Sequence, residues 1–154
     1  MRVRIAVATA DGESVVDGHF AHAPKFAIYD IEPGKGVRRV ELRENPLGRI
    51  PDPDDPGAHH HHHHVEVEGV VLHGIEKYAY LRERVLSDAD VVVAGGACMT
   101  SVQYFYSEGV KLVFTQPGTR ADEVAKALES YEGDLPGLAL YEQGSLKNLE
   151  EDEE

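Results

Sequence analysis

Two short apolar runs place the strongest constraint on the fold of this chain. Residues 89–96, ADVVVAGG, and residues 110–114, VKLVF, are almost continuously apolar and rich in valine. Such runs are typical of strands that are buried on both faces of a parallel sheet. Apolar residues at helical spacing lie before, between and after these runs, over residues 74–87, 100–109 and 118–133. The pattern predicts an α/β fold.

The first third of the chain predicts antiparallel strands. Residues 2–10, 25–32 and 37–44 are rich in β-branched and aromatic residues, and PGKG at 33–36 supplies a hairpin turn. With the two buried runs, these segments predict a mixed, mostly parallel five-stranded sheet with helices packed on its faces.

Composition limits the organisation and the partners. A chain of 154 residues suits one domain, which we assign to residues 1–140, with a disordered histidine-rich loop at 45–64 and an acidic tail at 141–154. The net charge of −13 and the lack of a basic stripe argue against a nucleic-acid partner. We find no signal peptide and no apolar run of membrane-spanning length, so we expect a cytoplasmic protein without a membrane partner. The single cysteine excludes an internal disulfide.

The loops that leave parallel strands are the first candidates for a ligand site, because ligands bind beyond the carboxyl ends of such strands. His19 and His22 lie in the loop after the first strand, and each offers an imidazole to a transition metal or else decorates a turn. Gly95 and Gly96 follow the buried run 89–94, where their amides either bind an anion or only permit a tight turn. Cys98, near the start of the next helix, is either a soft-metal ligand or an inert small residue.

Two further groups carry possible metal chemistry. The run of His59, His60, His61, His62, His63 and His64 has the composition of an expression tag, yet its position inside the chain favours a native loop that chelates nickel, zinc or cobalt. Asp11, Glu13 and Asp17 share the first loop, where a magnesium-dependent hydrolytic site is the third and weakest alternative.

Several segments together resemble the dinitrogenase iron-molybdenum cofactor biosynthesis family, whose members include NifX- and NafY-like carriers and the C-terminal domain of NifB. The matching segments are the opening RIAVA, then GHFAHAPKF at 18–26, the histidine-rich loop, ADVVVAGGACMTS at 89–101 and EGVKLVFTQPGTRADEVAKAL at 108–128. The sequence departs from the family pattern at Ala21, where glycine is usual, and at Ala97-Cys98, where an apolar residue and glycine are usual.

The resemblance implies a ribonuclease H-like three-layer α/β/α fold and a non-enzymatic carrier or scaffold for an iron–sulfur or iron–molybdenum-type cluster or its precursor. It makes His19 the main ligand, with His22 and Cys98 auxiliary and with the amides of Gly95 and Gly96 as donors to an anionic cluster. Its partners would be metallocluster assembly proteins. The competing hypothesis is a buffer or chaperone for divalent nickel, zinc or cobalt, in which His59–His64 binds the metal.

Overall fold

The computed structural model describes residues 2–32, 34–49, 64–67, 70–131 and 134–149. Its strands are β1 (Val3–Thr9), β2 (Lys25–Glu32), β3 (Gly36–Glu44), β4 (His64–Val67), β5 (Val70–His73), β6 (Val91–Ala94), β7 (Lys111–Phe114), β8 (Leu138–Glu142) and β9 (Ser145–Asn148). Its helices are α1 (Ile75–Arg84), α2 (Met99–Ser107) and α3 (Ala121–Ser130), with 3-10 turns η1 (Phe20–His22) and η2 (Pro46–Arg49).

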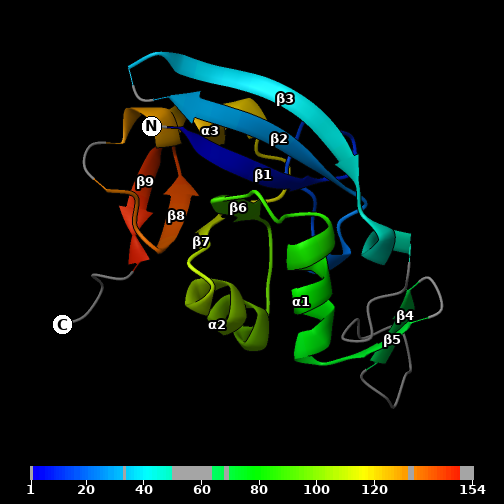
Figure 1. The fold of residues 1–154 in the computed structure, drawn as a ribbon. Coiled ribbons are helices and arrows are strands. Elements are labelled where there is room, and N and C mark those ends of the chain that lie inside the picture. The colour runs from blue at the N-terminus through cyan, green and yellow to red at the C-terminus, as the bar shows by residue number, and fades with distance from the viewer. Residues whose placement is uncertain (1, 33, 50–63, 68–69, 132–133, 150–154) are drawn as a thin grey trace.

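The main sheet has seven strands in the order β3-β2-β1-β6-β7-β8-β9. The prediction of an α/β fold with a mixed sheet is confirmed, but the prediction of five mostly parallel strands is wrong. The pairs β1–β6, β6–β7 and β7–β8 are parallel. The pairs β1–β2, β2–β3 and β8–β9 are antiparallel. The sheet is therefore a parallel centre with an antiparallel flank on each side (Figure 1).

The two additional strands come from a tight hairpin near the C-terminus. Gln143 and Gly144 both have positive φ, 56° and 87°, which is the conformation of a two-residue hairpin turn that matches strand twist. Burial alternates along β8, as expected for a strand with one face against the core. The sheet thus extends beyond position 140, where we expected the acidic tail to begin.

The segment predicted as a histidine-rich loop is described only at its two ends. Residues 46–49 form η2, and β4 begins at His64 and pairs with β5 in a separate two-stranded sheet. Residues 50–63 lie outside the described part of the chain, so the predicted disorder of the loop stays a prediction.

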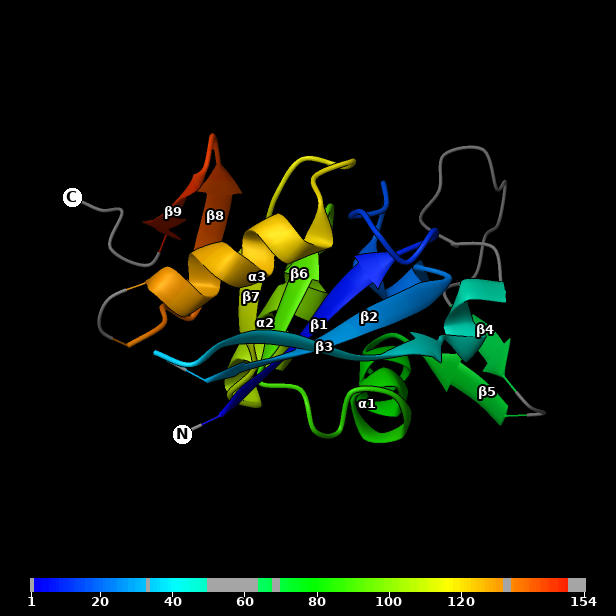
Figure 2. The same ribbon diagram turned by 90° about the horizontal axis from the view of Figure 1, so that it is seen from above.

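Side chains that alternate along the central strands form two apolar cores. In β1, Ile5 and Val7 point into the core that α3 covers, whereas Ala6 and Ala8 point into the core that α1 and α2 cover. This alternation is what the two-residue period of a strand requires when both faces are buried. The result is three layers, with α3 on one face and α1 and α2 on the other (Figures 1 and 2). The ribonuclease H-like assignment stays a prediction.

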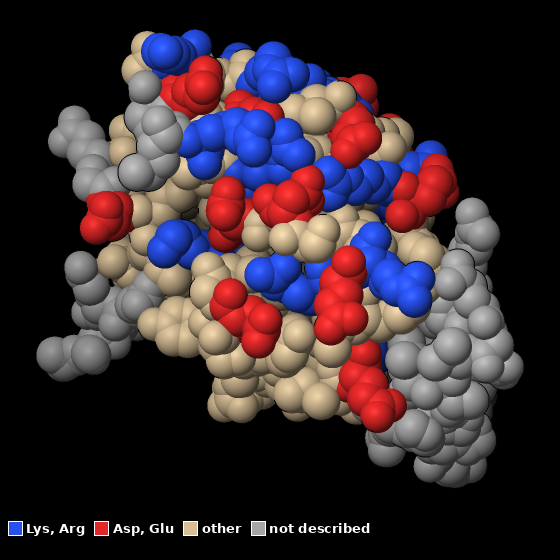
Figure 3. Space-filling model, in the orientation of Figure 1, with Lys and Arg blue, Asp and Glu red and all other residues tan. Residues whose placement is uncertain are grey.

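Charged side chains on the β2–β3 side are interleaved by sign (Figure 3). The centre of this network is Asp30, 3% exposed, whose carboxylate accepts two hydrogen bonds from Arg4 at 2.7 and 2.8 Å. Arg4 also donates to Asp88 at 2.8 Å, as does Arg43. Hydrogen bonds from Arg4 hold the pKa of Asp30 below its usual value, and those from Arg43 and Arg4 do the same for Asp88.

None of the helices in the described part of the chain has the length and apolar character needed to cross a membrane.

Candidate functional site

The loops after β1 and β6 are in direct main-chain contact. Because these strands are parallel neighbours, their carboxyl ends meet at one edge of the sheet, as the sequence predicted. The Phe20 N–H donates to the Gly96 carbonyl at 3.0 Å. A Cβ on Gly95 would lie only 2.5 Å from the Val16 carbonyl oxygen, and one on Gly96 would lie 3.0 Å from that of Gly18. The two glycines thus permit the close approach that fixes one loop against the other.

The histidine loop is held by η1 and by one buried ring. Phe20 and Ala21 are fully buried, and the Phe20 ring meets the Phe105 ring of α2 edge to face at 5.4 Å. His19 caps the turn, because its Nδ1 accepts a hydrogen bond from the Ala21 N–H at 3.1 Å. With Nδ1 as acceptor, a neutral His19 carries its proton on Nε2, so Nε2 is the atom directed out of the turn.

His19, Cys98 and Tyr78 form a compact group, which we call the Cys98 cluster. His19 Nε2 lies 3.3 Å from Cys98 Sγ, the Tyr78 hydroxyl lies 3.0 Å from the same sulfur, and the hydroxyl lies 3.4 Å from His19 Nε2. The rings of His19 and Tyr78 stack at 5.7 Å with 5° between their planes. The three side chains come from three different elements: the β1 loop, α1 and the start of α2.

Cys98 is the N-cap of α2 and exchanges hydrogen bonds with Ser101. The Cys98 N–H donates to the Ser101 hydroxyl at 3.1 Å, and that hydroxyl donates to the Cys98 carbonyl at 2.8 Å. Burial raises the pKa of the Cys98 thiol, but hydrogen bonds from Tyr78 and Ser101 outweigh it, so its net pKa lies below the usual value. Ser101 is buried, so its hydroxyl holds the Cys98 backbone from the interior of the protein.

His22 lies beside the cluster and contacts a buried lysine. Its ring is 6.1 Å from the His19 ring, centroid to centroid, at nearly a right angle. Its Nδ1 faces the Leu47 carbonyl at 3.2 Å and must donate there, because a carbonyl only accepts. Its Nε2 therefore carries the ring's lone pair, which accepts a hydrogen bond from the Lys77 ammonium at 3.2 Å.

The donor set suits a thiophilic metal. With bonds of about 2.3 Å to sulfur and 2.1 Å to nitrogen, a metal that binds two atoms 3.3 Å apart has a bond angle of roughly 97°, which a distorted tetrahedral site tolerates. Nε2 of His19 can bind a metal only after it gives up its proton, either by losing it or by transfer to Nδ1. Transfer to Nδ1 would break the hydrogen bond that Nδ1 accepts from the Ala21 N–H. His19 and Cys98 thus fit a metal after one local proton shift.

The structure does not test the histidine run as a ligand set, and it gives the acidic loop residue Asp11 another role. His59–His63 lie outside the described residues, and His64 starts β4, of which the structure describes only the backbone. Asp11 accepts hydrogen bonds from the Glu13 and Ser14 N–H groups, so it organises its own loop, and these bonds lower its pKa. In the part of the chain that the structure describes, no group of three or more His, Cys, Asp or Glu residues is placed to hold a metal ion.

Tyr78 and Lys77 are the two site residues that sequence reasoning missed. Tyr78 has helical spacing with the apolar residues of the predicted helix 74–87, which indicates a core residue and no role in a site. Lys77 carried a signal, because it lies four residues before the fully buried Leu81 and so falls on the same helix face. A lysine on the buried side of an amphipathic helix points to a partner inside the protein.

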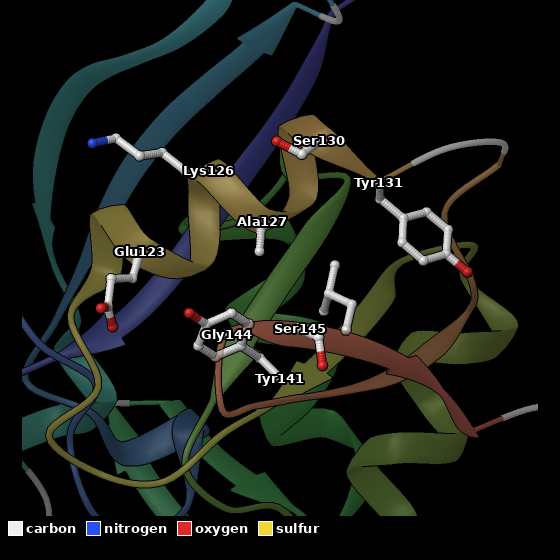
Figure 4. A pocket seen from close by; sticks show the side chains of 9 residues that line it. Glu123, Lys126, Ala127, Ser130, Tyr131, Tyr141, Gly144 and Ser145 are labelled. Atoms are coloured by element: carbon white, nitrogen blue, oxygen red, sulfur yellow. The ribbon is translucent and has the colours of Figure 1, made fainter.

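A hollow of about 540 Å³ lies away from this site, between α3 and the β8–β9 hairpin. Tyr131, Tyr141 and Ser145 contribute hydroxyl groups to its lining, and Lys126 points away from the latter two (Figure 4). None of the Cys98 cluster lines it, and it belongs to the opposite face of the sheet.

Comparison with known proteins identifies the chain at the level of family. A family model described as "Dinitrogenase iron-molybdenum cofactor" matches residues 1–131. The crystal structure of PH0822 superposes with a TM-score of 0.52 at 23% sequence identity, covering 82% of this chain and 89% of that one. At this identity the likeness supports the fold alone. No curated protein matches the chain in sequence.

Proposed function

The chain belongs to the dinitrogenase iron-molybdenum cofactor family, which ties it to the biosynthesis of that cofactor, and from this membership we propose that it is a non-enzymatic carrier or scaffold. Its cargo is an iron–sulfur or iron–molybdenum-type cluster or a precursor of one. The observation that carries the proposal is the 3.3 Å separation of His19 Nε2 and Cys98 Sγ at the sheet edge where ligands bind in α/β folds.

The roles of the site residues follow from their chemistry. Cys98 supplies a thiolate, which a lowered pKa favours, and His19 supplies an imidazole nitrogen. His22 is an auxiliary ligand, and the amides of Gly95 and Gly96 are donors to the sulfides of an anionic cluster. Three side-chain ligands at most leave much of the cargo without bonds to the protein, which suits a carrier that must release it.

The position of the Cys98 cluster also suits transfer of the cargo from one protein to another. Cys98 is partly exposed, and the adjacent Met99 is 70% exposed, so the rim of the site reaches the molecular surface. An exposed methionine is a common feature of adaptable contact surfaces. We therefore propose that the donor and acceptor are metallocluster assembly proteins that dock over this rim, and that the whole exchange takes place in the cytoplasm.

Anaerobic reconstitution with ferrous iron and sulfide tests the proposal. We expect stoichiometric iron and sulfide on the wild-type chain and on a variant that lacks residues 59–64, measured by metal analysis, absorption and EPR. His19→Ala and Cys98→Ser should each lose the cluster, whereas Thr100→Ala, an exposed position two residues from Cys98, should keep it. Loss of iron on deletion of residues 59–64, with nickel or zinc bound tightly to the intact chain, would instead support the metal-buffer function.

A further inference from the structure

Lys77 is a buried cation that has no carboxylate partner among the described residues. It lies in the first turns of α1, and its side chain is only 5% exposed. Lysine is almost never buried to this degree unless it is paired. Among the described residues no Asp or Glu pairs with it, and its contacts are His22 Nε2 at 3.2 Å and the Tyr78 ring, whose centroid is 5.2 Å from the ammonium.

The two contacts of Lys77 both lead to the Cys98 cluster. His22 stands at right angles to His19, and Tyr78 contacts both His19 and Cys98. Neither contact supplies a negative charge: the His22 nitrogen is a neutral lone pair, and the aromatic ring offers only its electron-rich face. A buried ammonium in this environment gains most from an anion placed at the cluster.

A bare metal cation, in contrast, is disfavoured at the Cys98 cluster by the same lysine. The lone pair on His22 Nε2 is the one that a metal needs, and Lys77 occupies it. A divalent cation at the Cys98 cluster would also face the repulsion of a nearby ammonium that is poorly screened by water. Lys77 therefore disfavours a cation in two ways, by occupying the His22 lone pair and by charge repulsion. It favours an anion by charge attraction.

We propose that Lys77 selects an anionic metal–sulfur cargo over a bare metal cation at the Cys98 cluster. This inference rests on the proposed function, because it names the charge class of the same cargo. In the unloaded protein the ammonium holds His22. On loading it exchanges His22 for the negative charge of the cargo, and His22 Nε2 becomes available as a ligand.

The test compares the wild type with Lys77→Met, in the full-length chain. Methionine has a similar length and suits a buried position, so the fold should persist, which circular dichroism and urea unfolding check. Lys126→Met, on α3 and away from the cluster, is the matched control for removing one positive charge. The anionic probe is the cluster reconstituted from ferrous iron and sulfide, and the cationic probe is Co²⁺ alone.

The two probes should respond in opposite directions. We expect Lys77→Met to lose its reconstituted iron–sulfide cluster to a chelator roughly tenfold to hundredfold faster than the wild type. This is the effect of one ion pair at an intermediate dielectric constant. It should bind Co²⁺ more tightly than the wild type. Because Cys98 is the only cysteine, the thiolate-to-cobalt charge-transfer band reports this site alone, and the histidine run competes equally in every variant.

Each other outcome is decisive. Equal weakening of both probes would overturn the inference and make Lys77 a structural tie between α1 and η1. Unchanged cluster retention would also overturn it. If the wild type takes up no cluster, the proposed function fails, and the inference is then judged on Co²⁺: tighter binding by Lys77→Met upholds the charge discrimination, and equal or weaker binding overturns it.

Discussion

Replacing Tyr78 by phenylalanine isolates one hydrogen bond at the Cys98 cluster. The substitution keeps the ring that stacks on His19 and removes only the hydroxyl, which lies 3.0 Å from Cys98 Sγ. That hydroxyl is among the groups that lower the pKa of the thiol. Without it, the thiolate loses a donor and the pKa of Cys98 rises.

The size of the effect follows from the strength of a hydrogen bond to a charged group. Such a bond contributes about 1.5–3 kcal/mol, so the thiolate fraction at a pH below the thiol pKa falls about tenfold to 150-fold. The thiolate of a thiol with a higher pKa is the more reactive nucleophile. On a logarithmic scale this higher reactivity offsets about half of the fall in the thiolate fraction. The rate of alkylation of Tyr78→Phe at neutral pH should therefore be about fourfold to fifteenfold lower than that of the wild type.

The assay is the pH dependence of alkylation by iodoacetamide, followed by mass spectrometry on the metal-free protein. Tyr80→Phe, in the same helix but facing Arg84, is the control and should leave the profile unchanged. At alkaline pH, where both thiols are ionised, the Tyr78→Phe variant should react at least as fast as the wild type. A uniform change in rate at every pH would refute the reasoning, because it would show altered access and not an altered pKa.

Three further predictions concern the scaffold. Asp30→Asn leaves Arg4 without its main charge partner and should lower the free energy of unfolding in urea by about 3 kcal/mol. Since the folded-state pKa values of Asp30 and Asp88 are lowered, their stabilisation is complete above about pH 4 and is lost below it, so the urea midpoint should fall on acidification, and less so in Asp30→Asn. Gly95→Ala should cost about 1–3 kcal/mol in urea unfolding and slow cluster uptake, because its Cβ would collide with the Val16 carbonyl.

Local patterns in the sequence were enough to predict the central elements. The valine-rich runs became β6 and β7, and β2 and β3 pair as an antiparallel hairpin as predicted, because strand periodicity and turn chemistry act over a few residues. The β8–β9 hairpin was missed because its strands are short and its turn begins with Gln143, whereas asparagine or glycine is the usual signal for such a turn.

The site was predictable only as far as topology determines it. His19 and Cys98 were assigned to one edge because their loops follow parallel strands, and the structure brings them to 3.3 Å. Helical spacing with Leu81 indicates that Lys77 is buried, but the partners of Tyr78 and Lys77 depend on how α1 packs against the sheet and against α2, which no local pattern encodes. The helix predicted over 100–109 starts earlier, with Cys98 as its N-cap, because the Ser101 hydroxyl faces back and accepts from the Cys98 N–H.

The two halves of the site are held by different forces, and this separates binding from selection. His19 and Cys98 lie on loops joined by a main-chain hydrogen bond and by glycines that leave no space between them. Lys77 and Tyr78 are neighbours on one helix and contact His22 and Cys98 only through side chains. A change on α1 can therefore alter the charge and the proton affinity of the site while the two metal ligands keep their positions. For this reason substitutions at Lys77 and Tyr78 should alter which cargo is bound and how fast Cys98 reacts, whereas removal of His19 or Cys98 should abolish binding.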